Sequence, residues 1–171
     1  MSKRGGVWLV LLGLLGGNVP LAAGQGNLTA RDVEPLVGEW ILDASKSGVT
    51  DPERRVITLG GGQLRVEMYR PDDDRPPTLI YKLDGSSSST PFGAGTAKTE
   101  IRREGAEIMT VAVITINERS VTVEERLNVA ASGEMVAAVT VRVEHGYQGV
   151  LPPLETKAPN VAQAVKYFRK N

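Results

Sequence analysis

The sequence predicts an all-β protein, and three observations carry that prediction. From residue 36 onward, Val, Ile and Thr recur at alternating positions, the period of two that places side chains on opposite faces of a strand. Short stretches rich in Gly, Asn, Asp and Pro separate these runs. No internal repeat or change of composition divides the 171 residues. We therefore expect one domain of about eight or nine consecutive antiparallel strands.

The first 24 residues are typical of a secretory signal peptide. Lys3 and Arg4 form a basic start, residues 7–15 are apolar, and Ala22-Ala23-Gly24 offers small residues for cleavage. A membrane anchor is the alternative, but the apolar run is far below the roughly 20 residues that span a bilayer. We expect a secreted or periplasmic protein with no membrane span after cleavage.

Residues 25–35 form a polar leader, in which Thr29 and Asp32 have the spacing of a capping box for one helical turn. The barrel domain is expected over residues 36–171. Its first four strands are predicted at 36–43, 54–59, 63–70 and 78–83, because alternating apolar residues such as Leu64, Val66 and Met68 mark one face. A polar loop at 44–53, three glycines at 60–62 and a Pro-Asp loop at 71–76 separate them.

A long loop is expected at 84–95, where Asp84-Gly85 is followed by four serines. Strands are then predicted at 96–103, 107–116, 120–129 and 135–144, separated by Glu104-Gly105 and other short turns. A connection containing Pro and Gly follows at 146–159. Residues 161–169 fit both a strand and a helical stripe. We prefer a strand, because a last strand could close the edges of an open sheet.

A meander of this kind removes its exposed edges by closing into an up-and-down barrel. A β-sandwich is the competing architecture, but its crossing connections are longer than most of the turns in this sequence. A barrel of eight strands has an interior just wide enough for side chains or one small ligand.

The first predicted strand carries a short signature, Gly38-Glu39-Trp40. This G-x-W pattern resembles that of lipocalins and the wider calycin group. Residues 37–47, the Y-x-x-D-G step at 81–85 and the aromatic and basic end at 166–170 resemble small secreted bacterial lipocalin-like proteins. The resemblance implies a lipocalin-like barrel in which Trp40 lies across the closed end and Arg169 packs on its indole.

Composition excludes several kinds of chemistry. The chain has no Cys and a single His, His145, which excludes thiol nucleophiles, Cys-ligated metals and sites with two imidazoles. Its 20 basic and 20 acidic residues argue against nucleic-acid binding. Loss of Lys3 and Arg4 with the signal leaves 18 against 20, a net charge of −2.

No enzyme activity, cofactor or metal is predicted. A run of three aspartates, Asp72-Asp73-Asp74, could hold a hard cation. The run lacks the calcium-loop spacing, so we expect a solvated hairpin tip instead. The serines at 86–89 lack the nucleophile elbow of a hydrolase.

One apolar face is the candidate binding site for a small hydrophobic or amphipathic molecule. Its alternative is a filled barrel that serves as a structural or interaction module of the cell envelope through the loops at 84–95 and 146–160. An interior of less than a few hundred Å³ would favour the filled barrel. The candidate residues are Leu64, Val66, Met68, Leu79, Tyr81, Val123, Glu125, Val139 and Val141.

Glu125 interrupts the apolar alternation of its strand. If it points inward, it needs an Arg partner or a bound polar group, and Arg102 or Arg103 could supply the charge. One interpretation is therefore an anchor for a ligand head group. The other is a strand end near the barrel mouth, where Glu125 reaches water.

Overall fold

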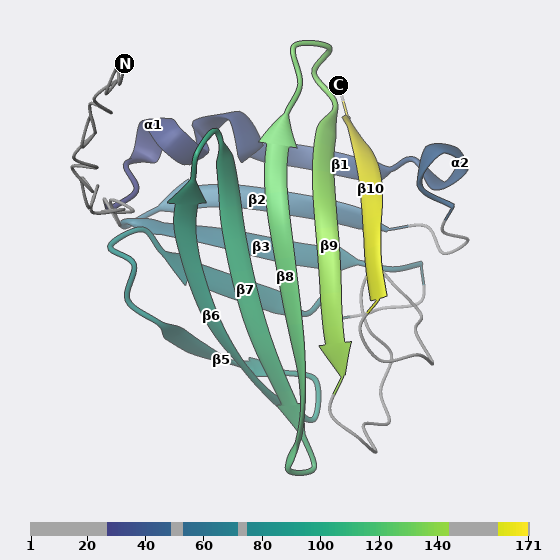
Figure 1. The fold of residues 1–171 in the computed structure, drawn as a ribbon. Coiled ribbons are helices and arrows are strands. Elements are labelled where there is room, and N and C mark those ends of the chain that lie inside the picture. Colours follow the sequence, from purple (N-terminus) through teal and green to yellow (C-terminus); the bar gives the residue numbers. More distant parts are fainter. Residues whose placement is uncertain (1–26, 49–52, 72–74, 144–160, 171) are drawn as a thin grey trace, which may run out of the picture.

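The computed structural model describes residues 27–48, 53–71, 75–143 and 161–170, which contain a ten-stranded antiparallel sheet (Figure 1). Neighbours in the sheet are neighbours in sequence, except that β10 lies between β1 and β9. The predicted up-and-down barrel is confirmed, with ten strands instead of eight or nine. The strands are β1 (Gly38–Leu42), β2 (Arg54–Gly60), β3 (Gln63–Tyr69), β4 (Thr78–Lys82), β5 (Ser88–Phe92), β6 (Gly95–Glu104), β7 (Glu107–Ile116), β8 (Arg119–Val129), β9 (Met135–Val143) and β10 (Val161–Arg169).

Several predicted features lie outside the described residues. They are the signal peptide at 1–24, the Asp72–Asp74 loop tip, His145 and the connection at 146–159. Within the described residues, no helix is long and apolar enough to cross a membrane.

Residues 161–169 form a strand, β10, as predicted, and this strand joins the two halves of the barrel. β10 pairs with β1 through Trp40 and Arg169, and with β9 through Val165 and Ala137. In Figure 1, β6–β9 pass in front of β2 and β3 at a steep angle, so the two halves of the sheet wrap around one interior. A helix at 161–169 would leave β1 and β9 as open edges, which explains the preference for a strand.

The barrel closes at a seam between β4 and β5, the two edges of the sheet. Within the described residues, no backbone ladder joins these two strands. Threonine hydroxyls link β4 to the far side of the seam instead: Thr90 Oγ1 on β5 donates to the Thr78 carbonyl at 3.3 Å, and Thr99 Oγ1 on the adjacent β6 donates to the Ile80 carbonyl. The seam is therefore held by side chains rather than by a continuous set of backbone hydrogen bonds.

Two parts of the predicted element list were wrong. The loop expected at 84–95 contains β5, whose residues Ser, Ser, Thr, Pro and Phe have weak strand propensity. Pro91 is tolerated because β5 is an edge strand, where a missing N–H is not needed on the open side. The polar loop after β1 begins with one helical turn, α2 (Ala44–Ser47), whose N-cap Asp43 accepts a hydrogen bond from the Lys46 N–H.

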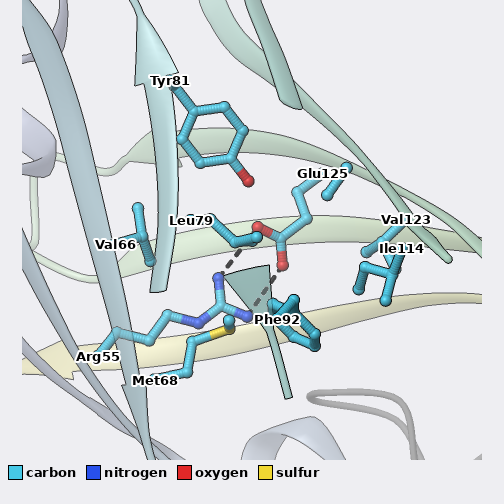
Figure 2. A pocket seen from close by; sticks show the side chains of 10 residues that line it. Arg55, Val66, Met68, Leu79, Tyr81, Phe92, Ile114, Val123 and Glu125 are labelled. Atoms are coloured by element: carbon cyan, nitrogen blue, oxygen red, sulfur yellow. Dashed lines mark hydrogen bonds and ion pairs between the residues drawn. The ribbon is translucent and has the colours of Figure 1, made fainter. Parts of the chain in front are cut away.

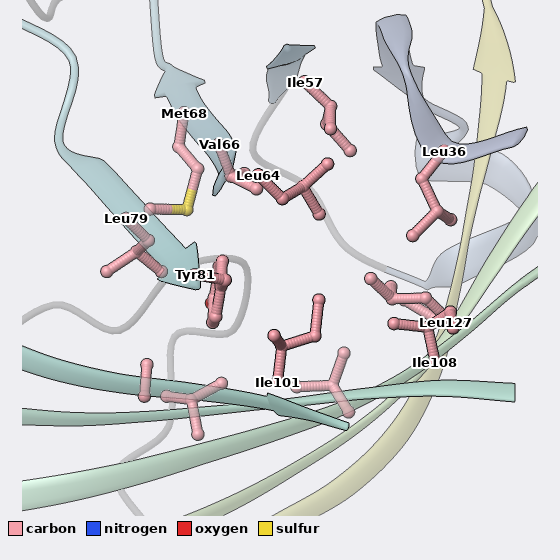
Figure 3. Close-up of a cluster of buried hydrophobic side chains, with 14 of the residues drawn as sticks. Leu36, Ile57, Leu64, Val66, Met68, Leu79, Tyr81, Ile101, Ile108 and Leu127 are labelled. Carbon is pink, nitrogen blue, oxygen red and sulfur yellow. The ribbon is translucent and has the colours of Figure 1, made fainter. Parts of the chain in front are cut away.

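A short helical segment covers one end of the barrel. It comprises α1 (Ala30–Val33) and η1 (Glu34–Leu36). The capping box forms as its spacing predicts, because Asp32 accepts hydrogen bonds from the N–H and hydroxyl of Thr29. An ion pair of 2.6 Å between Asp32 and Arg103 ties the segment to the end of β6. Leu36 faces Ile108 and Leu127 in the interior (Figure 3).

Trp40 is completely buried beneath this segment and donates its indole N–H to the Leu36 carbonyl at 2.8 Å. The Arg169 guanidinium carbon lies 4.5 Å from the Trp40 ring centroid. Its two terminal nitrogens donate to the carbonyls of Val37 and Pro35, both at 2.8 Å. Gly38 has a φ of +143°, and a Cβ there would lie 2.8 Å from Arg169 Nη1, so glycine is required at this close approach.

Candidate functional site

A small cavity lies inside the barrel, toward the seam. Its volume is about 20 Å³, which is room for one water molecule and far too little for a ligand. Because this volume is below a few hundred Å³, it favours the filled barrel over the ligand-binding barrel. The lining side chains come from β2, β3, β4, β5, β7 and β8 (Figure 2): Arg55, Val66, Met68, Leu79, Tyr81, Phe92, Ala112, Ile114, Val123 and Glu125.

All nine candidate residues are buried on the inner face of the sheet. Six of them line the cavity: Val66, Met68, Leu79, Tyr81, Val123 and Glu125. The other three, Leu64, Val139 and Val141, are almost completely buried but do not line it. The period-two pattern therefore selects the inner face of each strand, whereas the curvature of the sheet decides which inner residues meet at the cavity.

Glu125 points inward and is 9% exposed. Its partner is Arg55 on β2, and the pairing is bidentate: Nη1 donates to Oε2 at 3.1 Å and Nη2 donates to Oε1 at 2.9 Å. Figure 2 shows the two groups facing each other across the lining. The expected partners Arg102 and Arg103 were wrong, because their side chains are partly exposed and pair with Glu104 and Asp32 instead.

Arg55 is also held by a second carboxylate. Its Nε donates to Glu53 Oε1 at 2.5 Å, and the Tyr167 hydroxyl donates to the same oxygen at 3.0 Å. The Arg55 guanidinium carbon lies 4.7 Å from the Tyr167 ring centroid. We call Glu53, Arg55, Glu125 and Tyr167 the interior charge cluster.

The cluster strongly favours a charged Arg55. Burial alone would lower the pKa of Arg55, but its electrostatic interactions with Glu125, Tyr167 and Glu53 raise it well above its ordinary value. Burial raises the pKa of the Tyr167 phenol, with Glu53 and Glu125 adding to the effect against the opposing charge of Arg55. Burial and Glu125 likewise raise the pKa of Tyr81. The site therefore holds a permanent cation beside two neutral phenols.

Sequence reasoning missed four lining residues: Arg55, Phe92, Ala112 and Ile114. Phe92 was missed because β5 was assigned to a loop. Arg55 had a signal, since Ile57 is an inward residue of the same strand and the period of two places residue 55 on the same face. The register therefore predicts an inward-facing arginine at position 55, but it does not show which carboxylate that arginine meets.

A larger hollow of about 300 Å³ lies near the start of the described chain. Its lining is mostly polar and includes Asp84, Glu100 and Arg102. This composition does not suit an apolar ligand. Among the described residues, no group of three or more His, Cys, Asp or Glu side chains is placed to hold a metal ion.

No protein-family model matches the chain, and no curated protein matches it. Solved structures do share its fold. One is a secretary abundant heat soluble protein from Ramazzottius varieornatus, with TM-score 0.54, 12% identity and coverage of 80% of this chain and 96% of that one. Another is apo lipid binding protein 8 from Caenorhabditis elegans, with TM-score 0.51, 12% identity and coverage of 85% and 100%. At these identities, the likeness shows that the chain is similar to them in fold.

Proposed function

We propose that the barrel interior binds one small hydrophobic or amphipathic molecule and that the protein is a binding protein rather than an enzyme. The observation that carries this proposal is the Arg55–Glu125 ion pair in the wall of an apolar cavity. A purely structural core gains little from such a pair, because burying two charges costs about as much as their attraction returns. Buried charges beside a cavity are typical of binding sites.

The fold supports the proposal, since one of the solved structures with this fold is named a lipid binding protein. Binding requires the interior to expand beyond about 20 Å³. Met68 and Phe92 are the lining residues best able to make room. Met68 has a flexible side chain, and Phe92 lies on β5, beside the seam that has no ladder in the described residues.

A fluorescence titration with N-phenyl-1-naphthylamine, a neutral apolar fluorophore, tests the proposal. We expect saturable binding of one fluorophore per chain. Ala112→Leu should weaken binding at least tenfold by filling the cavity, whereas Val113→Leu, on the outward face of the same strand, should not. Met68→Ala should strengthen binding by enlarging the cavity. Absence of saturable binding by both the unaltered chain and Met68→Ala would rule the proposal out.

The second candidate is the filled structural or interaction module, and the small cavity volume favours it. In that case the fluorophore neither binds saturably nor raises the melting temperature, and Ala112→Leu changes only stability. The same titration therefore separates the two candidates.

We also propose that the chain is exported, on the basis of the basic start, apolar run and small residues of positions 1–24. Mass spectrometry of the protein recovered from its host should give a mature chain that begins near residue 25. Recovery of the intact chain starting at Met1 would contradict export by cleavage.

A further inference from the structure

The interior charge cluster carries more negative than positive charge. Its formally charged members are the carboxylates of Glu53 and Glu125 and the guanidinium of Arg55. Among the described residues, Arg55 is the only buried cation. One guanidinium therefore faces two carboxylates, and the formal sum is one negative charge inside the barrel.

Two carboxylates already balance the positive charge of the guanidinium. Three of its N–H groups are directed at carboxylate oxygens, at 2.5, 2.9 and 3.1 Å. One face of its plane is covered by the Tyr167 ring at 4.7 Å. A carboxylate head group entering the cavity would meet a neutralised Arg55 and the negative Glu125. Such a ligand would bury a second uncompensated negative charge, which is costly.

One hydrogen-bond acceptor in the interior charge cluster is unsatisfied within the described residues. Glu53 is 4% exposed, and its Oε2 atom is buried without a hydrogen-bond partner in the described part of the chain. Its other oxygen already accepts from both Arg55 and Tyr167. The cluster thus has an excess of acceptors as well as an excess of negative charge.

We propose that the ligand of the interior is an amphiphile with a cationic, hydrogen-bond-donating head group of the alkylammonium type, and that alkyl carboxylates are rejected. This inference rests on the proposed function. The ammonium would bind Glu125, which lines the cavity, while the apolar chain contacts Val66, Leu79 and Ile114. Glu53 acts as a positioning residue: it neutralises Arg55 from the Nε side and so leaves charge on Glu125 for the ligand.

Calorimetric titration with decylamine, decanol and decanoate, which share one chain length, tests the head group directly. At physiological ionic strength we expect decylamine to bind at least tenfold more tightly than decanoate, with decanol between them. Decanoate binding as tightly as decylamine would overturn the head-group assignment and leave the proposed function standing. If none of the three binds, the proposed function fails and this inference fails with it.

Two variants separate the cluster from the general charge of the protein. Glu53→Gln makes the cluster formally neutral, and we expect it to reduce the ratio of decylamine to decanoate affinity at least tenfold. Glu124→Gln is the matched control, because Glu124 adjoins Glu125 but pairs with Arg142 on the outer face. A ratio that falls equally in both variants, or that is unchanged in Glu53→Gln, would contradict the role of the cluster.

Discussion

At the scale of single residues, Arg55 decides the character of the interior. It is 2% exposed, its contact to Glu125 joins β2 to β8 across the barrel, and it also binds Glu53, which directly precedes β2. Neither carboxylate can be left alone in the interior without a large desolvation cost. Arg55 therefore has a structural role that must be separated experimentally from any role in binding.

Arg55→Met is expected to lower the free energy of unfolding by about 3–5 kcal/mol, because it leaves two buried carboxylates without their cation. The triple variant Arg55→Met, Glu53→Gln, Glu125→Gln should recover much of this loss, since it removes the charges together. Urea denaturation measures both values. A triple variant less stable than Arg55→Met would show that the cluster stabilises the fold through more than charge balance.

Arg169 also contributes to the stability of the fold, through its contacts at the closed end of the barrel. Arg169→Ala should cost about 1–3 kcal/mol, through loss of the cation–π contact with Trp40 and of the bonds to the carbonyls of Pro35 and Val37. Lys170→Ala is the control, because Lys170 forms only an exposed ion pair with Glu39, of a kind worth about 0–1 kcal/mol. Equal losses of stability in the two variants would show that the contacts of Arg169 with Trp40, Pro35 and Val37 contribute no more than an exposed ion pair.

At the scale of elements, the seam between β4 and β5 distinguishes this barrel from a fully closed one. Its described cross-links are the hydroxyls of Thr90 on β5 and of Thr99 on the adjacent β6, both bonded to β4 carbonyls. Elsewhere in the described sheet, neighbouring strands pair through backbone registers, as β7 does with β8 over nine residue pairs from Ile108 to Ile116. The seam is therefore where the barrel can open at the lowest cost.

Thr99→Val removes one cross-link while conserving shape. Because the Ile80 carbonyl then loses its donor, we expect a loss of about 1 kcal/mol and faster amide hydrogen exchange in β4, with β7 and β8 unchanged. Thr122→Val, on the outer side of β8, is the comparison. Uniformly faster exchange in all strands would argue against a locally weak seam.

Most of the strands can be predicted from the sequence, but β5 and the partner of Glu125 cannot. Eight strands are predicted from runs of apolar residues, most of which alternate with a period of two, and a ninth at 161–169 is predicted from the sheet edges that it closes. β5 escaped prediction because its sequence, Ser88-Ser89-Thr90-Pro91-Phe92, is that of a turn and only its position at a sheet edge makes it a strand. Similarly, Glu125 was recognisable as an inward charge, but its partner Arg55 lies 70 positions away, and only the barrel closure brings them together.

At the scale of the whole molecule, alkaline pH is expected to destabilise the barrel. Burial raises the pKa of both Tyr81 and Tyr167 above the ordinary value of 10.0. Above about pH 10 the unfolded chain loses these protons while the folded chain keeps them. The stability they contribute is therefore present below pH 10 and is lost as pH rises toward the folded pKa values.

Urea denaturation from about pH 8 to about pH 11 checks this dependence. Tyr81→Phe removes one of the two phenols, so its stability should fall less steeply than that of the unaltered chain. The charged and polar groups facing Tyr81 are Glu125, Arg55 and Thr110, and all remain in the variant. Identical slopes for the two proteins would show that Tyr81 is not held protonated by the fold.

Methionine methyl NMR can show whether the barrel interior accepts one amphiphile. Met68 lines the cavity, whereas Met109 is buried on the outer side of β7 against Arg102, whose Nη2 lies 2.9 Å from its sulfur. Titration of [13C]methyl-methionine protein with decanol should shift the Met68 methyl saturably and leave the Met109 methyl unchanged. An unmoved Met68, or equal shifts at both positions, would contradict binding in the interior.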